Sequence, residues 1–278
     1  MKVLILGATG LLGKALTHEW SGDEVVGLGS SDVDIRDANR VREIVMQARP
    51  DWIVLAAAYT DVDGCESNQE RAFSVNRDGA VNVAHAAKQA RAKLLFLSSD
   101  YVFDGKKSSP YEAGDTRNPQ SVYGRSKAEA EVRLLEISPS CCMARTSWLF
   151  GTGGKCFPDT ILKLAATRPT LDVVNDQRGC PTYSLDLARA IIDLCNKDAS
   201  GVVHVTNSGD CSWFEFAQEI VRESGLTTEV RPVSSQQMAR PAPRPAYSVL
   251  SPTSLHRYGI EMPTWKDALR RYLDARKG

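Results

Sequence analysis

Short, continuous runs of apolar residues recur along the first half of the chain. They are rich in branched side chains and span about 2–6, 23–28, 51–58, 92–99 and 141–148. Each run is separated from the next by a stretch with the hydrophobic spacing of a helix. Strands that are apolar on both faces and alternate with helices are typical of a parallel sheet covered on both sides. The pattern therefore predicts an α/β fold with a Rossmann-like, doubly wound parallel sheet.

The alternation stops after residue 150. The last 70 or so residues contain an amphipathic stretch at 212–225 and a loop rich in Pro and Arg at 239–248, which have no place in a simple alternating sheet. We therefore expect a large core and a smaller C-terminal lobe. The core would comprise residues 1–150, rejoined by about 171–206, and the lobe would comprise residues 151–170 and 207–278.

Composition excludes several classes of protein. Among 278 residues, 34 Lys and Arg balance 34 Asp and Glu, which argues against nucleic acid or a membrane surface as a partner. The seven cysteines are odd in number and include no C-x-x-C pair, so we expect buried reduced thiols. The four histidines are scattered, and no metal site is predicted. The first apolar run is too short for a signal peptide or membrane span, so a cytoplasmic protein is expected.

Three glycines follow the first predicted strand. Gly7, Gly10 and Gly13 form G-x-x-G-x-x-G between a strand and a helix. In a dinucleotide-binding turn, such glycines allow a tight turn, the approach of a pyrophosphate and close packing of helix on strand. The alternative is a plain strand-to-helix turn, because the usual spacing is G-x-G-x-x-G.

The residues after the next strands bear on the choice of cofactor. Ser30 and Ser31 lie where an acid that binds the adenosine ribose of NAD is usual, so NADPH is weakly favoured over NADH and use of both is expected. Asp34 and Ile35 would end a third strand and flank the adenine, although Asp34 could instead cap the following helix. The small side chains of Ala56, Ala57 and Ala58 would let the cofactor lie against the backbone.

Tyr123 and Lys127 lie four residues apart at the start of a predicted helix and therefore share one helix face. A neighbouring ammonium should lower the pKa of the phenol. Tyr123 could then protonate a carbonyl oxygen as a hydride reaches its carbon, while Lys127 steadies the charge and Ser99, at a strand end, adds a hydrogen bond. The alternative is a solvated helix face, because Y-x-x-x-K is a common pair.

Nine segments in chain order resemble the dTDP-4-dehydrorhamnose reductase family of the extended short-chain dehydrogenase/reductase superfamily. They are GATGLLG, AAAYTDVDGCE, VNRDGAVNVAHAA, SSDYVFDG, YGRSK, RTSWLFG, DQRGCPT, SWFEFA and RPAYSVL. The resemblance implies reduction of the 4-keto group of dTDP-4-dehydro-L-rhamnose to dTDP-L-rhamnose by NADPH or NADH. It also implies that the smaller lobe binds the nucleotide-sugar substrate.

The resemblance assigns roles to individual residues. Tyr123 would be the proton donor, Lys127 its partner that also holds the nicotinamide ribose, and Ser99 the hydroxyl where the family usually has Thr. Asp100 and Trp148 would contact the sugar nucleotide, although Trp148 could instead be a core aromatic at a strand end. The dinucleotide would lie against Gly10, Leu11, Leu12, Asp34, Ile35 and Ala56 to Ala58.

Two further expectations concern the ends of the substrate and a metal. Arg240 and Arg244 are candidates for the diphosphate, with a solvated surface as the alternative. Some bacterial members of the family place an acidic residue just after the glycine turn, where it takes part in a metal site at a dimer interface. This chain has Ala15 there, so we predict no such metal.

Two rival functions stay open. The first is another reaction on a nucleotide sugar, epimerisation or dehydration, although a dehydratase should carry a second acid where this chain has Tyr101 after Asp100. The second is a non-catalytic, dinucleotide-binding regulatory subunit resembling the beta subunit of methionine adenosyltransferase. The stereochemistry of the sugar, the base of the nucleotide, and the oligomeric state, monomer or homodimer, are not decided by the sequence.

Overall fold

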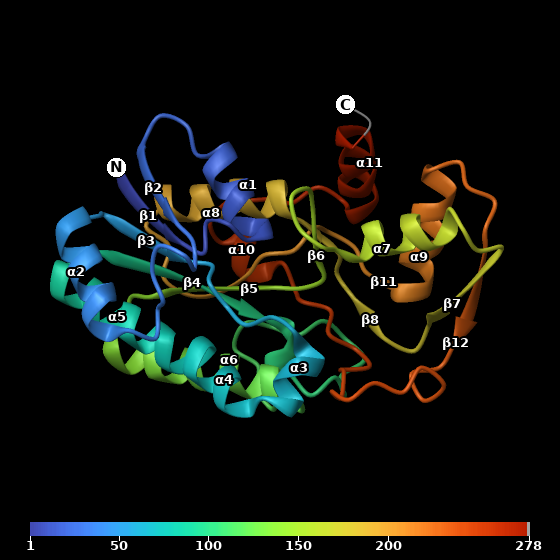
Figure 1. The fold of residues 1–278 in the computed structure, drawn as a ribbon, viewed down its shortest axis with the longest axis horizontal. Coiled ribbons are helices and arrows are strands. Elements are labelled where there is room, and N and C mark those ends of the chain that lie inside the picture. Colours follow the sequence, from blue (N-terminus) through green and yellow to red (C-terminus); the bar gives the residue numbers. More distant parts are fainter. Residues whose placement is uncertain (277–278) are drawn as a thin grey trace.

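The computed structural model describes residues 1–276, and its centre is a sheet of six parallel strands (Figure 1). The strands are β1 (Lys2–Leu6), β2 (Glu24–Leu28), β3 (Trp52–Leu55), β4 (Lys93–Ser99), β5 (Cys142–Thr146) and β10 (Gly201–His204). Their order across the sheet is β10-β5-β4-β3-β1-β2. The chain therefore winds outward from β1 in both directions, which confirms the predicted doubly wound fold.

Helices cover both faces of this sheet. One face carries α1 (Leu11–Glu19) and α8 (Ser184–Asn196), and the other carries α2 (Ala38–Ala48), α5 (Gly79–Ala90) and α6 (Val122–Ile137), as Figure 1 shows. Alternate strand residues enter the two layers: Leu95 and Leu97 pack with α1 and α8, whereas Leu94 and Phe96 pack with the other helices. Burial on both faces explains why the strand sequences are apolar without alternation.

Several short elements lie near the sheet. The chain between β3 and α5 forms α3 (Val62–Ser67), α4 (Gln69–Phe73) and a π-helical turn, η1 (Ser74–Asp78). A single 3₁₀ turn, η2 (Asp100–Val102), directly follows β4, and α10 (Thr253–His256) packs beside β10.

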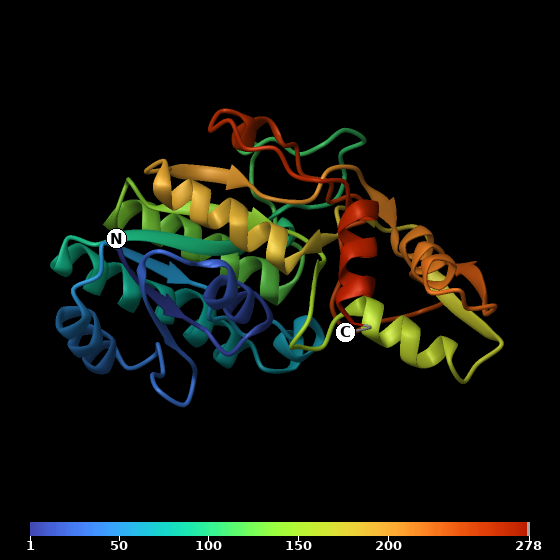
Figure 2. The same ribbon diagram turned by 90° about the horizontal axis from the view of Figure 1, so that it is seen from above.

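The smaller lobe joins helices to three two-stranded sheets. Its helices are α7 (Phe157–Ala165), α9 (Trp213–Glu223) and α11 (Trp265–Ala275). The paired strands are β7 (Thr170–Val174) with β12 (Glu229–Val233), β8 (Arg178–Gly179) with β11 (Cys211–Ser212), and β6 (Leu149–Phe150) with β9 (Thr182–Tyr183). In Figures 1 and 2, α7, α9, β7 and β12 lie together at one end of the molecule.

Residues 171–206 were expected to rejoin the core, but β7 at the start of this segment pairs with β12 and not with the central sheet. Its apolar residues Leu171 and Val173 pack into the apolar core of the smaller lobe. Within the returning segment, α8 and β10 are the parts that join the large core. Residues 277 and 278 of the predicted lobe lie outside the described part of the chain.

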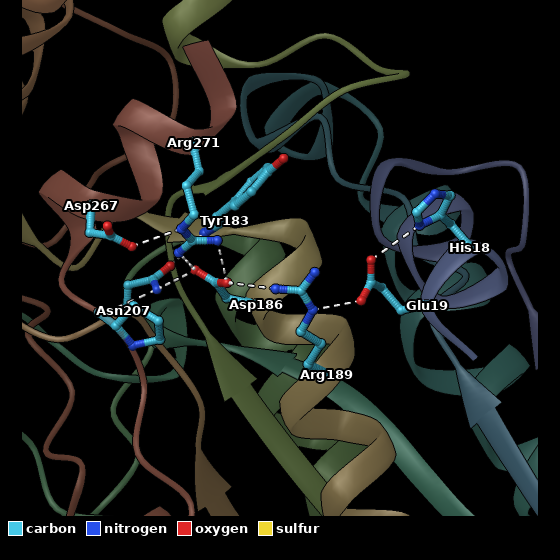
Figure 3. Close-up of polar contacts among 9 residues, drawn as sticks. His18, Glu19, Tyr183, Asp186, Arg189, Asn207, Asp267 and Arg271 are labelled. Atoms are coloured by element: carbon cyan, nitrogen blue, oxygen red, sulfur yellow. Dashed lines mark hydrogen bonds and ion pairs between the residues drawn. The ribbon is translucent and has the colours of Figure 1, made fainter. Parts of the chain in front are cut away.

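A chain of ion pairs ties the first helix to the last (Figure 3). On α8, Arg189 donates to Glu19 of α1 at 2.6 Å. Asp186, also on α8 and almost fully buried, accepts two hydrogen bonds from Arg271 of α11 at 2.8 and 2.7 Å. Asn207 adds a hydrogen bond to the same carboxylate at 2.7 Å. In this way α11, which packs with the smaller lobe, is also held to the large core.

Candidate active site

The glycine turn is shaped by backbone that only glycine allows. Gly7 has a φ of +97°, and a Cβ on it would lie 2.5 Å from the backbone nitrogen of Ala57. A Cβ on Gly13 would lie 2.1 Å from the carbonyl oxygen of Gly7. Gly10 is the N-cap of α1 and supplies no side chain to it. The start of α1 therefore offers backbone N–H groups to an anion, and the turn fits a pyrophosphate.

A cavity of about 840 Å³ runs from this turn along the ends of β2 and β3. Its lining includes Ser30, Asp34, Ile35 and Ala56 to Ala58, together with Arg36 and Arg71. Asp34 and Ile35 lie in a loop, so the expectation of a third strand there is wrong. Asp37, not Asp34, caps α2 by accepting hydrogen bonds from Asn39 and Arg40, which removes the capping alternative for Asp34.

Two arginines in this cavity were missed by the sequence reasoning. Arg36 donates to Asp34 at 2.5 to 2.9 Å, and these hydrogen bonds hold the pKa of the Asp34 carboxyl below its usual range. The guanidinium of Arg71 lies over the ring of Tyr59, 4.7 Å from its centroid. The D-x-R spacing of Asp34 and Arg36 is visible in the sequence and indicates a cation beside this carboxylate.

The predicted catalytic residues meet in a second cavity of about 440 Å³ at the carboxyl edge of the sheet. Parallel sheets bind their ligands at this edge. The cavity shares Gly7, Gly10, Ala56 and Ala58 with the first one, so the two are continuous along the glycine turn. Its lining also contains Leu11, Leu12, Gly13, Ser99, Asp100, Tyr123, Lys127 and Trp148.

Ser99 links the end of β4 to the phenol. Its hydroxyl donates to Asp100 at 2.9 Å and accepts from the backbone N–H of Tyr101 at 3.2 Å. Burial raises the pKa of the Tyr123 phenol above its ordinary value, and this effect exceeds the opposing effect of Ser99. The prediction that this pKa is lowered is therefore wrong in the ligand-free protein. Tyr123 holds its proton at neutral pH.

Lys127 is fully enclosed one helical turn after Tyr123. Its ammonium lies over the ring of Phe96, 4.1 Å from the centroid. Burial lowers the pKa of Lys127 to about 7, while the nearby Glu131 carboxylate opposes that change. Desolvation disfavours the charged form of an amine, so the ammonium is only partly populated at neutral pH without further anionic neighbours.

A buried ionic cluster lies behind Lys127. Glu131, one turn further along α6, accepts from Ser98 at 2.6 Å, from Arg145 at 2.8 and 2.6 Å, and from Arg117 at 3.0 Å. The side chain of Glu131 is 0% exposed and that of Arg145 is 2% exposed. These hydrogen bonds keep the pKa of Glu131 below its usual value despite its burial. The sequence reasoning missed this carboxylate, although its i, i+4 spacing from Lys127 was a signal.

Trp148 forms the side of the cavity next to the smaller lobe. Its backbone has a φ of +47°, an uncommon conformation for a residue with a large side chain. Its ring stacks on Trp213, the first residue of α9, with centroids 3.5 Å apart. A Cβ on Gly179 would lie 2.6 Å from the indole, so the glycine makes room for the stack. Trp148 is only partly buried, and Trp213 is a cavity residue that the sequence reasoning missed.

Arg240 and Arg244 line a third cavity of about 470 Å³, whose lining does not include the predicted catalytic residues. That cavity shares Trp213 with the second one. Both arginines pair with Asp63 of α3, at 3.4 Å for Arg240 and 3.0 Å for Arg244. The side chain of Arg240 is 59% exposed, whereas that of Arg244 is 18% exposed. The solvated-surface alternative therefore describes Arg240 better than Arg244.

All seven cysteines are buried free thiols. Among residues 1–276, no group of three or more His, Cys, Asp or Glu side chains is arranged to hold a metal ion. Within the same residues, none of the helices has the length and apolar character that a bilayer crossing requires.

Comparisons with known proteins agree with this geometry. The model of the family described as RmlD substrate binding domain matches residues 1–277. Spore coat polysaccharide biosynthesis protein SpsK of Bacillus subtilis is 42% identical over 277 residues, 99% of this chain and 98% of that protein. dTDP-4-dehydrorhamnose reductase of Mycobacterium tuberculosis is 40% identical over 284 residues, 99% of this chain and 93% of that protein.

A solved structure gives the same picture. The crystal structure of dTDP-4-dehydrorhamnose reductase from Bacillus anthracis in complex with NADP superimposes with a TM-score of 0.96 at 37% identity. The match covers 99% of this chain and 100% of that one. The resemblance seen in the sequence motifs is thereby confirmed along the whole chain. This protein belongs to the dTDP-4-dehydrorhamnose reductase family.

Proposed function

We propose that this chain reduces the 4-keto group of dTDP-4-dehydro-L-rhamnose to give dTDP-L-rhamnose, with NADPH or NADH as the reductant. The observation that carries the proposal is the convergence of Tyr123, Lys127 and Ser99 with the glycine turn on one cavity. Relatives of similar length that bear the name dTDP-4-dehydrorhamnose reductase support the choice of substrate.

The chemistry needs one hydride and one proton for each ketone. When bound, the reduced nicotinamide supplies the hydride to the carbonyl carbon. Tyr123 gives its phenolic proton to the carbonyl oxygen, which becomes the hydroxyl of the product. Once its hydroxyl proton turns away from Asp100, Ser99 donates a hydrogen bond to the same oxygen while negative charge develops on it. The raised pKa of Tyr123 suits this direction of reaction, because the phenol must start protonated.

Lys127 acts on Tyr123 and on the cofactor. Its ammonium favours the phenolate that remains after proton transfer. It would also hold the nicotinamide ribose, as the family resemblance implies. The diphosphate of the cofactor would lie at Gly7, Gly10, Leu11, Leu12 and Gly13.

The adenosine half of the cofactor would lie in the first cavity. Asp34, Ile35 and Ala56 to Ala58 would surround the adenine and its ribose. Ser30, Arg36 and Arg71 favour NADPH, since hydroxyls and guanidinium groups accept a 2′-phosphate better than carboxylates do.

The substrate would lie between the core and the smaller lobe. Asp100 is 1% exposed, burial raises its pKa to about 6, and its Oδ2 has no hydrogen-bond partner among residues 1–276. Such an oxygen suits a sugar hydroxyl as donor. Trp148 would pack against the sugar, and Arg244, with Arg240, would hold the diphosphate. In this arrangement residues 1–150 would bind the cofactor, and the C-terminal lobe would bind the nucleotide part of the substrate.

A panel of 4-keto nucleotide sugars tests the proposal. Purified protein is mixed with each sugar and with NADPH or NADH, and the loss of reduced nicotinamide is followed by absorbance. The product configuration is read by NMR, and Tyr123→Phe serves as the inactive control. Binding of NADPH without its oxidation by any sugar in the panel would favour the regulatory-subunit reading. Conversion of the sugar without net oxidation of the cofactor would favour epimerisation or dehydration. A cytoplasmic location and the choice between monomer and homodimer remain predictions.

A further inference from the structure

Two buried polar atoms in the second cavity lack partners within the chain. The atoms are Oδ2 of Asp100 and Oγ1 of Thr146, and neither has a hydrogen-bond partner among residues 1–276. Both residues line the cavity that contains Tyr123 and Lys127. A buried hydroxyl or carboxylate oxygen without a partner costs about 1–3 kcal/mol. Such atoms at an active site therefore indicate contacts that a ligand completes.

The position of Thr146 is fixed by the sheet. It is the last residue of β5 and stands in register with Ser99 at the end of β4. Because registered residues of neighbouring parallel strands point to the same face, the two hydroxyls are neighbours on the side of α1 and α8. The Ser99 hydroxyl already has partners in Asp100 and Tyr101, whereas the Thr146 hydroxyl has none among residues 1–276.

The strand order indicates what reaches Thr146. The adenosine cavity lies at β2 and β3, the pyrophosphate turn follows β1, and Tyr123 and Lys127 lie beyond β4. A dinucleotide bound along this edge would have its nicotinamide near the carboxyl ends of β4 and β5. The outermost polar group of that ring is its carboxamide, which has one acceptor and two donors to satisfy. We propose above that Asp100 binds a sugar hydroxyl. Of the two unpartnered atoms, the Thr146 hydroxyl is therefore the one left to bind the carboxamide.

We infer that the Thr146 hydroxyl hydrogen-bonds the carboxamide of the nicotinamide and so orients the ring that delivers the hydride. This assignment rests on the proposed function, because it needs the nicotinamide beside Tyr123. It makes Thr146 a cofactor-binding residue of a kind that motif reading did not mark.

The test compares two ligands and two substitutions. Thr146→Val removes the hydroxyl and keeps the shape, and Thr146→Ser keeps the hydroxyl. Affinities for NADP⁺ and for 2′,5′-ADP, which lacks the nicotinamide, are measured by calorimetry. We expect Thr146→Val to bind NADP⁺ about tenfold more weakly, the value of one hydrogen bond, and 2′,5′-ADP unchanged. Thr146→Ser should bind both ligands as the wild type does.

A stability measurement separates this role from a structural one. Removing a buried hydroxyl that has no partner should leave the ligand-free melting temperature of Thr146→Val equal to the wild type or higher. A clear fall in that temperature would overturn the inference. So would equal NADP⁺ affinity in Thr146→Val and wild type, or a loss confined to binding of dTDP-L-rhamnose. If the wild type itself failed to bind NADP⁺, the proposed function would fall before this inference is tested.

Discussion

Replacing Glu131 by Gln should destabilise the protein far more than the loss of an ordinary carboxylate. The side chain is fully buried and accepts hydrogen bonds from Ser98, Arg145 and Arg117. Gln has nearly the same shape, so packing is preserved. Its amide carries no charge, however, and its NH₂ group would face a guanidinium that can only donate. The substitution leaves the buried Arg145 charge without its counter-ion.

Removing one partner of a buried ion pair costs about 3–5 kcal/mol. For a protein of this size, that corresponds to a fall in melting temperature of roughly 6–20 °C. Glu129→Gln is the matched control: it lies on the same helix, is 50% exposed and pairs with Arg77. Exposed pairs contribute about 0–1 kcal/mol, so this control should stay near the wild type.

Urea unfolding at neutral pH measures the free energy of both variants without adding salt. The double variant Glu131→Gln, Arg145→Met should recover part of the loss, because it removes both charges. The folded-state pKa of Glu131 is lowered, so its contribution is present above the ordinary pKa of a glutamate and is lost as the pH falls. The gap between wild type and Glu131→Gln should therefore narrow in acid. Equal stability of Glu131→Gln and Glu129→Gln at neutral pH would refute the reasoning.

Three further expectations follow from the site. Tyr123→Phe should lower turnover by about 10² to 10⁴, because no acidic proton remains for the oxygen, while calorimetry shows nearly unchanged cofactor binding; wild-type turnover would end the proposed mechanism. Activity should be the same with and without EDTA, since no metal-ligand cluster is found among residues 1–276; activity lost in EDTA and restored by Mg²⁺ would contradict this. Gly179→Ala should raise the Michaelis constant for the sugar nucleotide several-fold, because its Cβ would displace the indole of Trp148 from Trp213. The matched variant Gly22→Ala tests a glycine with positive φ and open space around it, and its Michaelis constant should not change.

The parts of the structure that are local in sequence could be predicted. The apolar runs of β1, β3, β4 and β5 predict strands buried on both faces. The spacing of Gly7, Gly10 and Gly13 predicts the turn before α1. The pairing of Tyr123 with Lys127 needs only one helical turn. These features depend on near neighbours, so one sequence is enough to reveal them.

The parts that depend on distant residues could not be predicted. Nothing near Glu131 in the sequence shows that Arg145, from the neighbouring β5, neutralises it. The stacking of Trp148 on Trp213 joins two segments of different lobes. The pKa of Tyr123 was predicted in the wrong direction because its burial, and not its charged neighbour, has the largest effect on it. Burial is a property of the folded molecule, and a short motif does not contain it.

The ion pairs among α1, α8 and α11 join distant parts of the chain, and this affects how the protein folds during its synthesis. Glu19 and Arg189 are 170 positions apart, and Asp186 and Arg271 are 85 apart. The edge of the sheet at β5 also stays without its neighbouring strand until β10 is synthesised, after β6 to β9. Closing such long loops costs conformational entropy before the contacts can stabilise the folded chain. These contacts therefore form late in folding. A nascent chain leaving the ribosome would thus expose the apolar surfaces of α1 and β5 until α8 and β10 emerge, and partly folded chains with such exposed surface are prone to aggregate.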